Sequence, residues 1–106
     1  MKTLNYWAKE IHDNAVKHGW WDEPRSFAEI VALCHSELSE ALEEDRQGNP
    51  VIYFKNGKPE GIATEMIDCM IRILDWCGHA GINPDELLAT KHEFNKTRPY
   101  KHGKNY

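Results

Sequence analysis

GIATEMIDCMIRILDWCGHA, residues 61–80, is the stretch that decides the fold. Its apolar residues surround a helix almost completely. Four charged residues interrupt them at spacings of three, four and three: Glu65, Asp68, Arg72 and Asp75. At 100° per residue these side chains share one stripe of the helix surface. An unpaired carboxylate is costly to bury, so a stripe of this kind on a buried helix predicts a compensating charge nearby.

Two helices are predicted upstream of this stretch. Apolar residues recur every three or four positions over 3–18, and Gly19 ends that helix. Residues 26–29, Ser-Phe-Ala-Glu, fit the S-x-x-E capping box. The second helix is therefore expected to begin at Ser26 and to end before Gly48.

Residues 49–60 break the helical pattern. Val51 to Phe54 favour a strand, and Asn56-Gly57 is a strong signal for a tight turn. Pro59 in the returning arm argues against a larger sheet. A small hairpin and an ordered loop both fit this segment.

A fourth helix is predicted after the Asn83 cap, with Pro84 in its first turn. It runs to Lys96 or Thr97, and residues 100–106 form a basic tail. The sequence thus predicts an all-α fold, namely a four-helix bundle-like protomer with a short β-hairpin insertion. No linker or repeat divides it, so residues 1–106 are expected to form a single domain.

Size and composition favour an oligomer. A chain of 106 residues with 41% apolar content can bury only a thin core by itself. We therefore expect an oligomer in which another copy of the chain completes the core. A formal net charge of −4 excludes a general nucleic-acid binder.

Three cysteines in no zinc-like spacing favour free thiols in a reducing compartment. No secretory signal or membrane-length apolar run is recognisable. These features together predict a soluble, cytoplasmic protein without a membrane partner.

Two pairs of carboxylates form the first candidate site. Glu37 and Glu40 lie one helical step apart, as do Glu65 and Asp68. Four oxygen-bearing side chains on two facing helices suit Mg²⁺, with Mn²⁺ as a substitute, whereas zinc would require His or Cys. The alternatives are a solvated acidic face and a structural salt bridge from Arg72 to Asp68.

Basic and amide side chains near the C-terminus form the second candidate site. Lys91, Asn95 and Arg98 share one helical face, and Lys104 follows in the tail. Such groups bind phosphate oxygens. A solvated basic helix end is the alternative, because positive charge there also suits the helix dipole.

Taken together, these residues resemble the MazG-like all-α nucleoside triphosphate pyrophosphohydrolases. The family signature E-x-x-E followed by E-x-x-D corresponds in this chain to Glu37-Leu-Ser-Glu40 and Glu65-Met-Ile-Asp68, with 24 residues between them. The resemblance covers almost everything from Trp20 onward. Its flanking segments are HSELSEALEE (35–44), GKPEGIATEMIDCMIRILD (57–75) and KHEFNKTRPYKHGKNY (91–106).

The resemblance implies a four-helix arrangement completed in a homodimer or homotetramer, and a hydrolase acting on acid anhydrides. It would use Mg²⁺ to cleave a nucleoside or deoxynucleoside triphosphate to the monophosphate and pyrophosphate. Glu37, Glu40, Glu65 and Asp68 would hold the metal, with Glu37 or Glu40 acting on the attacking water. The residues implied for the phosphates are Lys91, Asn95, Arg98 and Lys104.

The base pocket is the least defined part of the prediction. Trp7, Trp21 and His18 are candidates for contacting the base, although aromatic residues more often belong to a core or interface. Competing functions are a relative that acts on phosphoribosyl-ATP, a non-catalytic nucleotide-sensing or protein-binding helical module, and a purely structural helical dimer.

Overall fold

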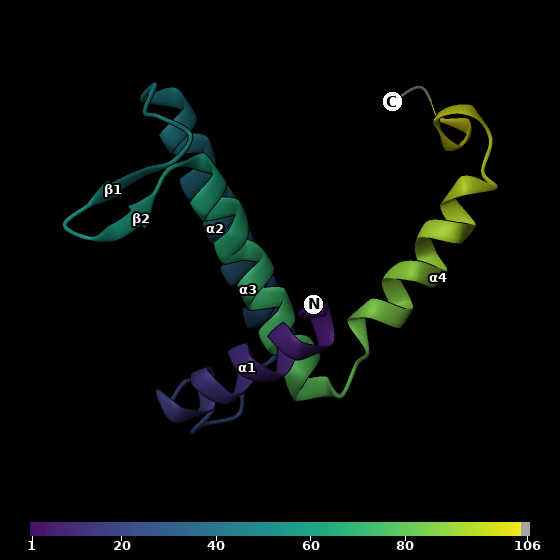
Figure 1. The fold of residues 1–106 in the computed structure, drawn as a ribbon, viewed down its shortest axis with the longest axis horizontal. Helices are drawn as coiled ribbons and strands as arrows, with labels where there is room; N and C mark the ends of the chain where they lie inside the picture. The colour runs from purple at the N-terminus through teal and green to yellow at the C-terminus, as the bar shows by residue number, and fades with distance from the viewer. Residues whose placement is uncertain (105–106) are drawn as a thin grey trace.

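The computed structural model describes residues 1–104, and four helices and one hairpin form its framework (Figure 1). The helices are α1 (Leu4–Lys17), α2 (Phe27–Arg46), α3 (Ile62–Ala80) and α4 (Pro84–Lys96). Strands β1 (Tyr53–Lys55) and β2 (Lys58–Glu60) join α2 to α3, and a 3₁₀ turn at Tyr100–Gly103 follows α4. Asn105 and Tyr106, the end of the predicted tail, lie outside the described residues. The predicted mostly helical chain with a hairpin is confirmed.

Local capping explains where the helices begin. The Ser26 side chain accepts a hydrogen bond from the Glu29 backbone N–H at 3.1 Å. Asn83 does the same for Glu86 at 3.0 Å, and Pro84 is the first residue of α4. Each cap satisfies a backbone donor that has no partner within its own helix. Both predicted starting points are therefore confirmed.

The hairpin closes through the predicted Asn-Gly turn. Asn56 and Gly57 both have positive φ, 53° and 79°, as a tight hairpin turn requires. Strand β1 pairs antiparallel with β2, so the segment is a hairpin rather than a loop. The Tyr53 hydroxyl donates to Glu44 on α2 at 2.9 Å, which ties the hairpin to the end of that helix. The carboxylate of Glu44 consequently raises the pKa of Tyr53.

Helices α2 and α3 run antiparallel against each other, the hairpin that connects them projects from one end of the pair, and α1 crosses the C-terminal half of α3 (Figure 1). A small core lies where α1 meets α3, built from Ala8, Leu74 and Cys77. Gly78 permits this close approach, because a Cβ there would stand 2.6 Å from the Cβ of His12 and 2.8 Å from the Ala8 carbonyl oxygen.

Replacing Gly78 by Ala should therefore destabilise the protein even though Ala favours helices. We expect a loss of about 1–3 kcal/mol from overpacking, which outweighs a propensity gain of about 1 kcal/mol. Urea denaturation followed by circular dichroism measures the change. Thr90→Ala, at an exposed site in α4, is a control that should not destabilise. A more stable Gly78→Ala protein would show that α1 does not lie this close to α3.

Helix α4 differs from the predicted bundle-like arrangement. It leads away from α2 and α3 (Figure 1), and none of its residues is buried. Its N-terminal turn is tied to α1, since the Asp85 carboxylate accepts from the backbone N–H groups of Leu4 and Asn5 at 3.1 and 2.9 Å. Leu87, Leu88 and Phe94 are 58%, 59% and 56% exposed. In the single chain, three helices pack together and the fourth projects from them.

Helix α3 is only partly covered in the single chain. Helices α1 and α2 bury two of its sides, and five apolar residues elsewhere on it stay exposed: Met66, Ile67, Met70, Ile71 and Ile73. Cys69 and Cys77 are buried, and all three cysteines are free thiols, as the sequence predicts. Within residues 1–104, no helix combines the length and apolar character needed to cross a membrane.

Candidate metal centre

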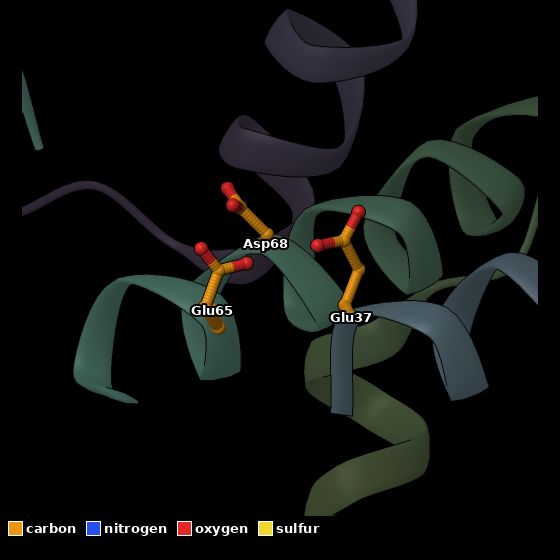
Figure 2. A group of neighbouring side chains, drawn as sticks. All are labelled: Glu37, Glu65 and Asp68. Carbon is orange, nitrogen blue, oxygen red and sulfur yellow. The ribbon is translucent and has the colours of Figure 1, made fainter. Parts of the chain in front are cut away.

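Facing turns of α2 and α3 bring three carboxylates together. One oxygen each from Glu37, Glu65 and Asp68 lies within 4.8 Å of the others. Figure 2 shows Glu37 rising from α2 beside Glu65 and Asp68 on α3. Glu37 and Glu65 are buried and Asp68 is half-buried. Three of the four predicted metal ligands therefore form one cluster.

The negative charge of Glu65 is the least compensated in this cluster. Its Oε2 is buried without a hydrogen-bond partner among the described residues. Burial raises the pKa of Glu65 to about 8, helped by the neighbouring carboxylates of Glu40 and Asp68. Near neutral pH this side chain must hold a proton unless another positive charge replaces it. A proton on Glu65 meets this requirement in the metal-free protein, and a bound cation is the alternative.

Glu40, the fourth predicted ligand, lies at the edge of the cluster. Its side chain is exposed and is not one of the three mutually close carboxylates. It nevertheless lies near enough to Glu65 to raise the pKa of that residue. A cavity of about 300 Å³ opens on this side of the site, and its lining is mostly acidic: Glu40, Glu43, Glu44, Gln47, Lys58, Glu60 and Glu65.

Arg72 is paired with Glu37 across the helix interface. Its Nε–H donates to Glu37 Oε1 at 2.8 Å. The alternative salt bridge from Arg72 to Asp68, suggested by their spacing, does not form among the described residues. Burial and the charge of Glu37 raise the pKa of Asp68, and Arg72 only partly opposes this. One arginine therefore leaves the cluster with excess negative charge.

A second cavity, of about 330 Å³, is lined by two of the clustered carboxylates, Glu37 and Asp68. Beside Glu37, Asp68 and Arg72 it is lined by residues from three segments: Ile11, Asn14, Ala15, Trp20, Arg25, Ile71 and Asp75. The Arg25 side chain is only 8% exposed, donates through Nε to Glu29 at 3.0 Å, and lies over the ring of Trp21. Sequence reasoning missed Arg25 and Asn14, because neither belongs to a periodic pattern or a motif.

Asp75 anchors the wall of this cavity. Its carboxylate accepts from His12 Nδ1–H at 2.8 Å and from Trp21 Nε1–H at 3.0 Å. The ring of His79 stacks on Trp21 with centroids 4.1 Å apart. Asp75 therefore joins α1, the connection before α2, and α3. Its donors come from α1 and from the connection before α2, whereas Arg72 pairs with Glu37.

We expect Asp75→Ala to destabilise the protein by about 1–3 kcal/mol, since two half-buried donors lose their acceptor. Urea denaturation measures the loss, and Trp21 fluorescence should report the change in its surroundings. Asp45→Ala removes an exposed carboxylate from α2 and serves as the matched control. Equal stability of the two variants would contradict a structural role for Asp75.

The three residues predicted to contact a base are scattered. Trp21 is engaged by Asp75 and His79. Trp7 lies on α1 against Tyr6, and His18 Nδ1–H donates to the Asn14 carbonyl at 2.8 Å. None of the three lines the cavity beside the carboxylates, whereas Trp20 does.

The predicted phosphate-binding residues lie on a different part of the chain. Lys91 and Arg98 flank the ring of Phe94 on α4, at 5.0 and 5.9 Å from its centroid. Lys104 lies in the exposed tail, and Asn95 Oδ1 is buried without a partner among the described residues. Because α4 leads away from α2 and α3, the single chain does not bring these residues to the carboxylates (Figure 1).

Comparisons with known proteins give no relative for this chain: no family model, no curated protein and no solved structure matches it.

Proposed function

We propose that this protein is a Mg²⁺-dependent hydrolase that converts a nucleoside or deoxynucleoside triphosphate to the monophosphate and pyrophosphate. The observation that carries the proposal is the cluster of Glu37, Glu65 and Asp68 with its unpartnered, buried Glu65 oxygen. A cavity lined by two arginines adjoins the cluster, so the proposed anion site would lie beside the proposed cation site. This pairing suits a phosphate chain carried with a metal ion.

The donor set fits a hard divalent cation. All three clustered groups are carboxylates, and Glu40 offers a fourth on the next turn of α2. Oxygen ligands of this kind suit Mg²⁺ or Mn²⁺, whereas zinc sites use His or Cys. Glu37, Glu65 and Asp68 would hold the metal. Ionising Glu65 in this setting requires a positive charge, which a bound metal would supply.

In the proposed reaction the carboxylates have separate roles. Bound Mg²⁺ would neutralise phosphate oxygens and supply a water of lowered pKa. Glu40 is exposed and lies outside the cluster, so it is free to take the proton from the attacking water. Arg25 would hold the anionic chain through the N–H groups of its guanidinium that Glu29 leaves free.

We further propose that the active form is a homodimer or homotetramer. The exposed apolar residues of α3 and α4 support this, because a monomer would leave them in water. A second copy covering these surfaces could also carry Lys91, Asn95, Arg98 and Lys104 to the carboxylates. Light scattering during size exclusion measures the mass. A monomer at micromolar concentration would contradict this part of the proposal.

The function is tested by measuring pyrophosphate release from a panel of nucleoside and deoxynucleoside triphosphates, with Mg²⁺ and with EDTA. The expected result is metal-dependent formation of monophosphate and pyrophosphate from some members of the panel. Phosphoribosyl-ATP belongs in the panel as the substrate of the competing enzyme function. Nucleotide binding without any cleavage would instead favour the nucleotide-sensing module and contradict the proposed activity.

A further inference from the structure

Arg72 is hydrogen-bonded to Glu37 and also lines a cavity. Its Nε–H donates to Glu37 Oε1 at 2.8 Å, and the arginine also lines the cavity of about 330 Å³ beside the cluster. The Glu37 side chain is 10% exposed, whereas the Arg72 side chain is 33% exposed. The acid is therefore held at the helix interface, while part of the arginine faces the cavity.

The ion pair and the proposed metal site compete for the same carboxylate. Arginine–carboxylate hydrogen bonds are among the stronger ones in proteins, and this one uses an oxygen of a proposed metal ligand. Glu37 cannot give its full charge to a cation while it also neutralises Arg72. Conversely, a guanidinium that loses its carboxylate partner has donors free for another anion.

We propose that Arg72 couples cation binding to anion binding at this site. Arg72 pairs with Glu37 until Glu37 ligates a divalent cation, and it then donates to an anion in the cavity that it lines. The inference rests on the proposed metal site and adds an order of events to it. The metal binds first, and its binding costs the free energy of the Arg72–Glu37 ion pair. The anion then offsets this cost by accepting hydrogen bonds from Arg72.

Coupling of this kind has a measurable signature. Replacing Arg72 by Gln removes the competitor of the metal, so the variant should bind Mn²⁺ about tenfold more tightly than the wild type, a difference of about 1.4 kcal/mol. The same variant should bind inorganic pyrophosphate about tenfold more weakly when Mg²⁺ is in excess. A salt bridge that only supports the fold would change neither affinity in these opposite directions.

Two further variants separate the coupling from a general charge effect. Arg46→Gln removes the same charge from an exposed position on α2 and should leave both affinities near the wild type. Arg72→Lys retains the charge and can still pair with Glu37, but it lacks the fork of donors. Its Mn²⁺ affinity should stay near the wild type, and its pyrophosphate affinity should be intermediate.

Isothermal titration calorimetry of the wild type and the three variants, each shown to be folded by circular dichroism, tests the coupling. Opposite changes in the two affinities of Arg72→Gln support the coupling. Equal Mn²⁺ affinity in wild type and Arg72→Gln, or unchanged pyrophosphate affinity, overturns the coupling and leaves the metal site standing. Absence of Mn²⁺ binding by both proteins overturns the metal site and, with it, the proposed function.

Discussion

Glu65→Gln should remove metal-dependent turnover while making the metal-free protein no less stable. The substitution keeps the shape of the side chain and removes the charge that a cation needs. We expect activity to fall by more than about 100-fold, since even residues that only support metal ligands cost 10–100-fold. The fold should survive because burial already favours the neutral form of Glu65, and glutamine imitates that form.

Pyrophosphate release and urea denaturation in EDTA measure the two halves of this expectation. Glu10→Gln, an exposed position on α1, is the matched control and should retain wild-type activity and stability. Glu65→Gln with wild-type turnover would remove Glu65 from the site. A variant that is inactive because it is unfolded would show that the Glu65 carboxylate supports the fold, which contradicts a role confined to metal binding.

The stability of the metal-free protein should fall as pH rises towards 8. In the unfolded chain Glu65 ionises near its ordinary pKa of 4.5, whereas in the folded chain burial holds its pKa at about 8. Between these values the folded state binds more protons, so stability is full below the lower pKa and is lost as pH rises through the upper one. For one proton the slope reaches at most about 1.4 kcal/mol per pH unit. The raised pKa of Asp68 acts in the same direction.

Urea denaturation in EDTA at several pH values between 5 and 9 measures this slope. Saturating Mg²⁺ should stabilise the protein more at pH 8 than at pH 6, because binding at the lower pH must displace a proton. Glu65→Gln should show a shallower slope and little effect of Mg²⁺. A wild-type protein whose stability is constant or rises over this range would contradict the electrostatic description of the cluster.

Local signals in the sequence were sufficient to predict the helices and the turn. Ser26 and Asn83 are helix caps in the structure, and Asn56-Gly57 forms the hairpin turn. These features depend on hydrogen bonds and backbone angles within a few residues, which a sequence displays directly. The path of α4 could not be predicted in the same way. The sequence pattern of α4 indicates a helix but does not show which surface this helix packs against.

The candidate site shows the same division between local and distant information. Helical spacing correctly placed Glu65 and Asp68 on one stripe, and the facing Glu37 completes their cluster. The partners of Arg72 and Asp75 were not predictable, because both come from other helices or from the connection before α2. Spacing along one helix reveals a shared face, whereas ion pairs across an interface depend on how the helices meet.

We propose above all that Glu37, Glu65 and Asp68 hold a divalent cation. Anomalous diffraction near the manganese absorption edge, from crystals grown with Mn²⁺, tests it most directly. We predict an anomalous peak within coordinating distance of these three carboxylates, with Arg72 no longer bonded to Glu37. An ordered cluster without such a peak, with the Arg72–Glu37 pair intact at saturating Mn²⁺, would contradict the claim.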